Sequence, residues 1–159
     1  MAQRICLFTG TFDPITKGHT DIIDRALGLF DSLIIGIGIN SSKQPMFSVE
    51  QRIEWIERIY KNEPKIKVIA YEGLTIDCCK NNNAQFILRG IRYINDFEYE
   101  KSIADMNRML APEVETVFLT CTPLYSTISS TLVRDVIRNN GNVHQFIPKA
   151  IVQDFKTSS

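Results

Sequence analysis

Apolar residues along this chain fall into two alternating patterns. The first consists of five short runs rich in Ile, Val, Leu and Phe, at residues 4–8, 33–39, 66–71, 85–88 and 114–119. Runs of this length and composition are typical of strands that are buried on both faces of a parallel sheet. The sequence therefore predicts five strands.

Between these runs, apolar residues recur every three or four positions, which predicts amphipathic helices that follow the strands. The pattern covers residues 22–30, 49–60, 99–110 and 132–137. Alternating strands and helices favour an α/β fold: a single doubly wound, Rossmann-like domain over residues 1–159, with a five-stranded parallel sheet and helices on both faces. Such folds bind ligands at the carboxyl ends of the strands, near the point where the strand order reverses.

Residues at the ends of the expected helices support this division. Ser48 and Gln51 form a capping-box pattern at the start of the second helix. The sequence Asn139-Asn140-Gly141 is a stop signal for the fourth, and Pro148 suits the first turn of a short final helix. Gly36 and Gly38 lie inside a predicted strand and face the same way, which predicts that a helix or ligand lies close to the sheet there.

The composition narrows the class of protein. The 18 Lys+Arg balance the 18 Asp+Glu, and the residues are 44% hydrophobic, as in an ordinary soluble globular protein. A balanced charge argues against nucleic-acid binding. No apolar run approaches the roughly 20 residues of a membrane span, and the N-terminal residues lack a signal-peptide pattern, so we expect a cytoplasmic protein with no membrane partner. The four cysteines have no zinc-ligand spacing, so we expect them to be reduced, and we expect no protein-held metal.

Positive charge gathers where the sheet's ligand edge is expected. Residues 32–49, 78–95 and 116–134 contain no Asp or Glu, yet each carries cations close to the end of a strand. These cations are Lys43, Arg89, Arg92 and Arg134. Cations without competing carboxylates, together with a hydroxyl-rich run over residues 120–131, predict a site for a polyanion.

The segment after the first strand has the character of an anion-binding turn. Gly10 and Gly18 enclose it, and His19 follows at the expected start of a helix, where free backbone N–H groups point toward an anion. His19 would act there as a hydrogen-bond donor. The chain contains no Gly-x-x-x-x-Gly-Lys-Ser/Thr phosphate loop, and no glycine-rich turn opens a helix in the dinucleotide-binding pattern.

Gly10-Thr11-Phe12-Asp13-Pro14 followed by Thr16-Lys17-Gly18-His19 closely resembles the signature of the nucleotidyltransferases with a T/H-x-G-H motif. Further segments resemble, more specifically, the bacterial phosphopantetheine adenylyltransferase family. They follow in order at residues 42–47, 89–92, 96–100, 106–108 and 128–134. The resemblance spans about residues 4 to 148.

This resemblance implies an enzyme that transfers the adenylyl group of ATP to 4′-phosphopantetheine, giving dephospho-coenzyme A and pyrophosphate, the penultimate step of coenzyme A biosynthesis. The implied catalytic residues are Thr11, His19, Lys43 and Arg92. The implied acceptor-binding residues are Thr11, Lys43, Thr75 and Arg89. The implied ATP-binding residues are Thr11, Phe12, His19, Gly90, Ile91, Arg92, Glu100, Tyr125, Ser126, Thr127, Ile128, Ser129, Ser130 and Thr131.

In this reaction the phosphate of the acceptor is already an anionic nucleophile, so we expect positioning and charge neutralisation rather than a general base. Mg²⁺ would accompany the ATP phosphates. The resemblance also suggests coenzyme A as an inhibitor and a homohexamer. The chain departs from the family's usual residues at Thr9, Gln44, Thr75, Tyr125 and Thr131, which leaves details of the adenine, phosphate and pantetheine contacts open.

Two alternatives stay open at this point. One is an adenylyltransferase for another phosphorylated acceptor, such as glycerol phosphate or nicotinamide mononucleotide, although the segments around Lys43 and Arg89 speak against it. The other is a catalytically silent module that senses adenine nucleotides, although His19 and Arg92 are both present.

Overall fold

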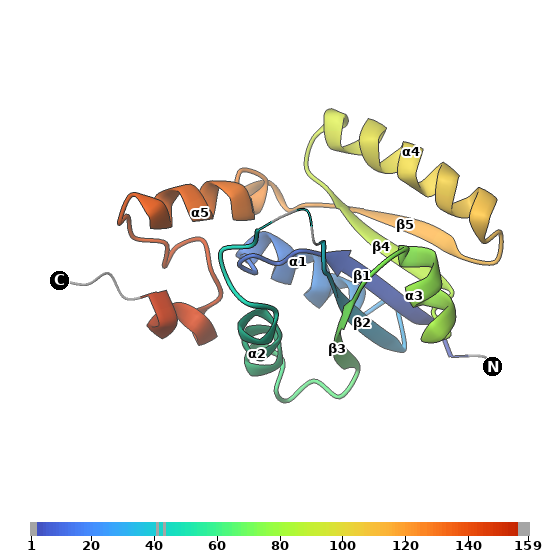
Figure 1. Ribbon diagram of the computed structural model, residues 1–159, viewed down its shortest axis with the longest axis horizontal. Coiled ribbons are helices and arrows are strands. Elements are labelled where there is room, and N and C mark those ends of the chain that lie inside the picture. Colours follow the sequence, from blue (N-terminus) through green and yellow to red (C-terminus); the bar gives the residue numbers. More distant parts are fainter. Residues whose placement is uncertain (1–2, 41, 43, 156–159) are drawn as a thin grey trace.

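A parallel sheet of five strands forms the centre of the computed structural model, which describes residues 3–40, 42 and 44–155 (Figure 1). The strands are β1 (Ile5–Gly10), β2 (Ser32–Gly38), β3 (Ile66–Tyr71), β4 (Phe86–Ile91) and β5 (Glu115–Thr120). The prediction of a five-stranded parallel sheet is confirmed, and β3 has the bounds expected from the sequence. β4 runs further than expected, so that Arg89 lies within the strand rather than beyond it.

The strand order β3-β2-β1-β4-β5 places β1 at the centre. The chain moves outward from β1 through β2 to β3, then crosses back to β4 on the other side of β1 and continues to β5. The order therefore reverses between β1 and β4. In a sheet of this kind the crevice at the carboxyl ends of these two strands is the expected ligand site.

Helices cover both faces of the sheet, as predicted. They are α1 (Lys17–Ala26), α2 (Val49–Ile59), α3 (Thr75–Asn81), α4 (Ile94–Leu110) and α5 (Ser130–Arg138), with two 3₁₀ helices, η1 (Pro123–Tyr125) and η2 (Lys149–Phe155). The short final helix after Pro148 is η2. The sequence analysis did not identify α3, because its seven residues are too few to display a period and no side chain caps its start.

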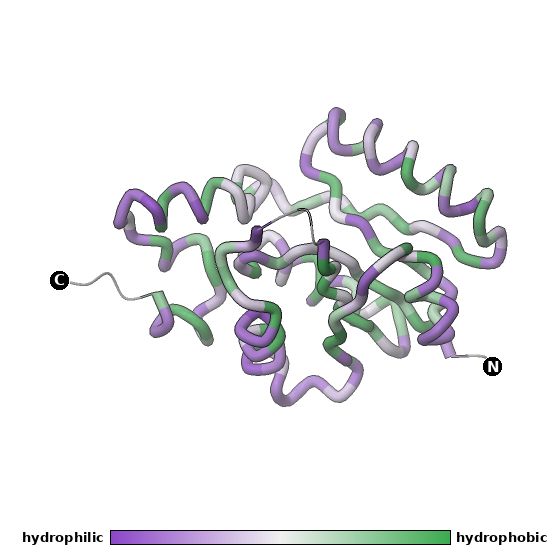
Figure 2. The backbone as a smooth tube through the Cα atoms, in the orientation of Figure 1, coloured by the Kyte–Doolittle hydropathy of each residue, from purple (hydrophilic) through white to green (hydrophobic). Residues whose placement is uncertain are grey.

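Alternate residues of β1, β2 and β4 enter one of two apolar cores. On β1, Cys6 and Phe8 join the larger core with α1, α2, α5 and η2, whereas Leu7 joins the smaller core with α3. Figure 2 shows hydrophobic colour along the strands and a mixture of colours along the helices, as expected for a buried sheet between amphipathic layers. Packing in the two cores holds β1 and β4 in place, and the site lies at the carboxyl ends of these strands.

The predicted helix ends and strand glycines are partly confirmed. The Ser48 hydroxyl accepts a hydrogen bond from the Gln51 backbone N–H, but the return bond from the Gln51 side chain does not form, so the capping box is half complete. Asn140 takes the left-handed conformation after α5, with a φ of 56°. A Cβ on Gly36 would lie 3.0 Å from Leu7 and 3.2 Å from the Tyr71 ring, so side chains of the neighbouring strands approach the sheet there, while Gly38 lines a cleft at the end of β2 that is open to a ligand.

Helix α4 differs most from its expected role. Its apolar spacing predicted an inward face, yet none of its residues is buried. Tyr99 is 67% exposed, Met106 60% and Leu110 53%. The helix rests on the edge of the sheet through Phe97, whose ring meets that of Phe118 edge-on at 5.6 Å. Its apolar side chains are distributed around the helix, so one sheet edge cannot cover them.

Candidate functional site

Two clefts open side by side at the carboxyl ends of β1 and β4. The smaller has a volume of about 250 Å³ and lies over the start of α1, and the larger, of about 680 Å³, extends toward β3 and α4. They share one wall, formed by Thr9, Gly10, Thr11 and Arg89. The cleft predicted where the strand order reverses is therefore present, and it consists of two adjoining clefts.

His19 lies in the smaller cleft and caps α1. Thr16 is the N-cap residue: its backbone N–H donates to Nδ1 of His19 at 3.0 Å, and the His19 backbone N–H donates to the Thr16 hydroxyl at 3.4 Å. A backbone N–H can only donate, so Nδ1 must be the unprotonated nitrogen. The neutral ring then carries its proton on Nε2, which makes Nε2 the donor that was expected here.

The surroundings of His19 keep its ring neutral. Burial, followed by the positive charges of Arg92 and Arg89, lowers the pKa of His19 from 6.5 to about 4. The ring also packs edge-on against Phe12, with centroids 5.0 Å apart. At neutral pH His19 is thus a fixed, uncharged N–H donor at the N-terminus of a helix, a suitable partner for a phosphate oxygen.

Phe12 has an unusual backbone conformation that places its ring. Its φ is 48°, in the left-handed region, and its side chain is 2% exposed. The ring lies so close to Gly10 that a Cβ there would be 3.1 Å from two ring carbons. A side chain at position 10 would therefore press on the Phe12 ring, a constraint that the sequence motif did not reveal.

Arg89 is held tightly in the wall between the clefts. Nε and Nη2 each donate to the Glu100 carboxylate at 2.6 Å, and Nη1 donates to both the carbonyl and the hydroxyl oxygen of Thr9, at 2.7 and 2.8 Å. Four of the five guanidinium N–H groups are thereby engaged, and one on Nη2 is left for a ligand. Thr9, which departs from the family's usual residue, thus has a specific role in positioning Arg89.

This pairing corrects one expectation from the sequence. The stretches without acids suggested cations without competing carboxylates, but the fold brings a carboxylate to each described cation of the set. Glu100 reaches Arg89, Asp96 pairs with Arg92 at 3.1 Å, and Asp13 lies 3.9 Å from Arg134. Asp96 and Glu100 follow directly after one of the acid-free stretches, whereas Asp13 comes from the distant turn after β1 and reaches Arg134 only through the fold.

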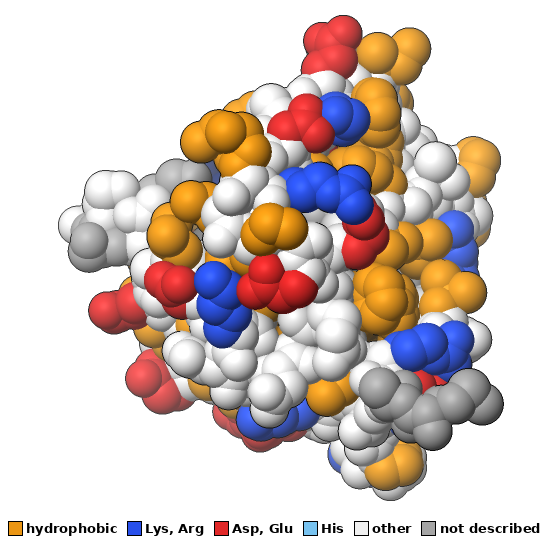
Figure 3. Space-filling model, turned by 90° about the vertical axis from the view of Figure 1, so that its right-hand side faces the viewer, with side chains coloured by type: hydrophobic (Ala, Val, Ile, Leu, Met, Phe, Trp, Pro, Cys, Tyr) orange, Lys and Arg blue, Asp and Glu red, His pale blue; other side chains and the backbone are white. Residues whose placement is uncertain are grey.

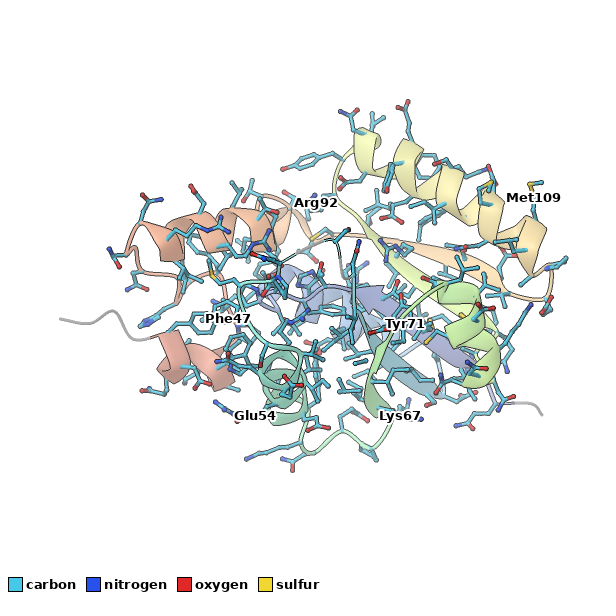
Figure 4. The ribbon with its side chains drawn as sticks, viewed as in Figure 1. Phe47, Glu54, Lys67, Tyr71, Arg92 and Met109 are labelled. Atoms are coloured by element: carbon cyan, nitrogen blue, oxygen red, sulfur yellow. The ribbon has the colours of Figure 1, made fainter. Side chains whose placement is uncertain are left out.

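Several residues of the predicted ATP set line the smaller cleft together. They are Thr11, Phe12, His19, Gly90, Arg92, Ile128, Ser129 and Ser130. The side chain of Arg92 projects between the starts of α4 and α5 (Figure 4). The remainder lie outside its lining: Ile91, Glu100, Tyr125, Ser126, Thr127 and Thr131. Glu100 lines the larger cleft instead. Thr131 accepts a hydrogen bond from Arg134.

The loop that carries Ile128 to Ser130 is anchored from α1. The carboxylate of Asp21 accepts hydrogen bonds from the backbone N–H and the hydroxyl of Thr122, at 3.2 and 2.7 Å. Ser129 caps α5, and the Ser130 hydroxyl donates to the carbonyl of Pro14 at 2.8 Å. The two loops that enclose the smaller cleft are therefore bonded to each other.

The larger cleft contains the described residues of the predicted acceptor set: Thr11, Thr75 and Arg89. Thr75 shares a hydrogen bond of 3.0 Å with the hydroxyl of Tyr71, whose ring also lines the cleft. Lys43, the fourth predicted residue, lies outside the described residues. The sequence analysis missed Tyr71 and Asn107, and they have no motif that could have identified them.

No group of three or more His, Cys, Asp or Glu that could hold a metal ion occurs among the described residues. Cys6, Cys78 and Cys79 are buried thiols, and burial raises the pKa of Cys79 to about 12, which leaves it unreactive. Cys121 is the half-buried fourth cysteine and lines the smaller cleft. In the part of the chain that the structure describes, no helix is long and apolar enough to cross a membrane.

Comparisons with known proteins agree with this geometry. A family model described as cytidylyltransferase-like matches residues 7–136. A phosphopantetheine adenylyltransferase of Flavobacterium psychrophilum is 52% identical over 149 residues, covering 94% of this chain and 98% of that protein. One of Bacteroides thetaiotaomicron is 49% identical with the same coverage. A bifunctional NMN adenylyltransferase/ADP ribose pyrophosphatase from Francisella tularensis shares the fold, with a TM-score of 0.71 at 20% identity, over 92% of this chain and 45% of that one.

Proposed function

This chain belongs to the cytidylyltransferase-like family and, within it, to the phosphopantetheine adenylyltransferases, and we propose that it transfers the adenylyl group of ATP to 4′-phosphopantetheine. The products are dephospho-coenzyme A and pyrophosphate. The observation that carries this proposal is the pair of clefts that meet at Thr11 and Arg89, because the reaction needs two anionic substrates side by side.

ATP occupies the smaller cleft in this proposal. Its phosphates meet the Nε2–H of His19, the N-terminus of α1 and the guanidinium of Arg92. The acceptor occupies the larger cleft, with its phosphate toward Thr11 and Arg89 and its pantetheine arm toward Thr75. The greater volume of this cleft suits the longer, flexible arm. Lys43 is the further cation that we assign to the acceptor phosphate.

The chemical step is a displacement at phosphorus. An ionised phosphate oxygen of the acceptor attacks the α-phosphorus of ATP, a new P–O bond forms, and the bond to the bridging oxygen breaks to release pyrophosphate. Negative charge builds on the α-phosphate oxygens, which His19 and Arg92 stabilise, while Thr11 aligns the attacking oxygen. No proton has to be removed from the nucleophile, which agrees with the neutral, donating state of His19.

Mg²⁺ enters as part of the substrate, bound to ATP. The described residues provide no cluster of carboxylates and histidines that would hold the ion alone. Mg²⁺ characteristically binds substrate phosphates and water with few protein ligands. Its charge would offset that of the leaving pyrophosphate.

We infer self-association from the exposed apolar surface of α4. Ile94 is 77% exposed, Met109 80% and Tyr99 67%. Figure 3 shows hydrophobic side chains gathered on the upper part of one face, where α4 lies. An apolar surface of this kind on a charge-balanced protein marks an interface, and we assign it to contacts between copies in a homohexamer. We place the enzyme in the cytoplasm, with coenzyme A as a competitor for the acceptor cleft.

The test is pyrophosphate release from Mg–ATP with a panel of acceptors. We expect rapid turnover with 4′-phosphopantetheine and little with glycerol phosphate or nicotinamide mononucleotide. Pantetheine, which lacks the phosphate, should give no adenylated product even at high concentration, because no base lies ready to deprotonate its hydroxyl. Preference for another phosphorylated acceptor, or ATP binding without turnover, would refute the proposed function.

A further inference from the structure

Two buried charged side chains lie next to the turn that carries Thr11. Among the described residues, the buried polar side chains are those of Thr9, Asp13, Thr16 and Arg52. Asp13 is 3% exposed and Arg52 is 2% exposed, and the sequence analysis assigned no role to either. Burying a charge is costly unless its partners are in place, so each of these side chains must serve a specific arrangement.

Asp13 binds the chain that leads into α2. Its Oδ2 accepts the backbone N–H of Met46 at 2.8 Å, and its Oδ1 accepts that of Phe47 at 2.9 Å. Both oxygens are thus used for neighbouring N–H groups of one segment. This segment begins three residues after Lys43 in the sequence, whereas Asp13 lies two residues after Thr11.

Arg52 makes the matching connection in the opposite direction. From the first turns of α2, its Nη1 donates to the carbonyl oxygen of Thr11 at 2.7 Å, and its Nε donates to the carbonyl oxygen of Ser48 at 3.2 Å. The negative charge of Asp13 favours the charged form of Arg52 against the burial that lowers its pKa. The turn at residues 11–13 and the segment at residues 46–48 are therefore joined by two buried ions of opposite sign.

The segment at residues 46–48 is also fixed to the core. The ring of Phe47, labelled in Figure 4 where the chain enters α2, meets that of Trp55 edge-on at 4.8 Å and that of Phe155 at 5.6 Å. Trp55 is completely buried. The backbone N–H groups held by Asp13 thus belong to a rigid part of the molecule, and the turn that carries Thr11 is held against it.

We propose that Asp13 and Arg52 are positioning residues for the adenylyl transfer, which hold Thr11 and the segment after Lys43 at a fixed separation. This inference rests on the proposed function, in which Thr11 aligns the attacking phosphate. Neither residue touches a substrate: neither lines the two clefts. Their contribution is to the alignment of acceptor and ATP, to which displacement at phosphorus is sensitive at the scale of about 1 Å.

The experiment compares two isosteric substitutions in the full-length enzyme. Asp13→Asn removes the charge and replaces one acceptor oxygen with an NH₂ group that faces a backbone N–H. The control is Asp154→Asn: the carboxylate of Asp154 also accepts two N–H groups, from Trp55 at 2.7 Å and Arg58 at 2.8 Å, and it also joins α2 to another segment. Asp154 lines neither cleft.

For Asp13→Asn we expect kcat to fall and the KM for 4′-phosphopantetheine to rise, each by about tenfold or more, from the lost charged hydrogen bond and the misplaced loop. The Kd for ATP, measured by calorimetry without acceptor, should change less than about twofold. Asp154→Asn should lower Tm while both KM values and kcat stay as in the wild type.

A second variant keeps the test decisive if Asp13→Asn does not fold. Arg52→Lys preserves the charge, but a single ammonium cannot replace the guanidinium that joins Thr11 to Ser48. We therefore expect kcat to fall and the KM for 4′-phosphopantetheine to rise again, with little change in the Kd for ATP. The positioning role would be overturned if the folded variants had wild-type kinetics, or if they lost affinity for 4′-phosphopantetheine and for ATP equally. An inactive wild-type enzyme would instead refute the proposed function, so the two failures are distinguishable.

Discussion

His19 caps α1 and, in the proposed mechanism, also stabilises the transition state, and its replacement by alanine tests both roles. The imidazole accepts the Thr16 backbone N–H and presents Nε2–H to the smaller cleft. Losing the cap bond should lower the free energy of unfolding by about 1 kcal/mol. Losing a donor that acts mainly on the transition state should lower kcat by roughly 10² to 10⁴, with little change in ATP affinity.

The pH dependence follows from the lowered pKa. The unfolded chain protonates His19 near pH 6.5, whereas the folded protein does so near pH 4. Between these values the unfolded state binds more protons, so the stability contributed by neutral His19 is complete above pH 6.5 and is lost as the pH falls toward 4. The difference corresponds to about 3 kcal/mol at most. The ring should stay neutral through the range in which activity is measured, so His19 should cause no inflection of kcat above pH 5.5.

Three measurements test this reasoning. Chemical denaturation from pH 4 to 8 should show a loss of stability at low pH that is smaller in His19→Ala. NMR titration should report the two histidines, and His144→Ala, which removes the other and exposed histidine, assigns the signals and serves as the kinetic control. A kcat that falls with an apparent pKa near 6.5, and does so only when His19 is present, would show that the ring transfers a proton and would refute the positioning mechanism.

Three further predictions concern other parts of the molecule. Arg89→Ala should weaken 4′-phosphopantetheine binding by about 1.5 to 3 kcal/mol and ATP binding far less. Adding Glu100→Gln should restore thermal stability without restoring affinity, because it neutralises a carboxylate that is only 12% exposed. If titrations show a larger loss for ATP than for 4′-phosphopantetheine, the two clefts are assigned in reverse. Ile94→Glu or Met109→Glu should shift the oligomer toward smaller species in sedimentation experiments, and an unchanged assembly would place the interface elsewhere. Gly10→Ala should cost about 1 to 3 kcal/mol, because its Cβ meets the Phe12 ring, whereas Gly28→Ala, with its nearest contact at 3.6 Å, should be tolerated in the same thermal unfolding assay.

The sheet could be predicted because each strand is a short run rich in apolar residues. The inner strands β1, β2 and β4 are buried, and the edge strands β3 and β5 are half-buried. The helices α1, α2 and α5 could be predicted because each has one apolar face on the larger core. Helix α3 could not, since seven residues around Cys78 and Cys79 show no period. The burial expected for α4 was wrong, because the apolar spacing from Tyr99 to Leu110 takes in only part of the helix, and its other apolar side chains lie around the remaining faces.

The site was predictable to the extent that its residues are close together in sequence. The turn from Gly10 to His19 provided the motif, the helix start and the donor. Arg52 carried a signal that was not used: it lies three residues after Val49 and four before Ile56, on the apolar stripe of α2, where a charge has to be buried with a partner. Thr9 and Tyr71 carried no comparable signal, since their roles depend on side chains from other strands and helices.

The ion pairs at the sheet edge explain how a site for polyanions can exist on a chain with no net charge. A half-buried guanidinium such as that of Arg89 would be costly to hold without a counterion, and Glu100 supplies one through two short bonds. The same bonds fix the plane of the guanidinium, so that its remaining N–H lies ready in the wall between the clefts. A phosphate that binds there adds to an arrangement already in place, because Thr9 and Glu100 have oriented Arg89 beforehand. Preorganisation of this kind lowers the cost of aligning two anions, which is the main demand of the reaction.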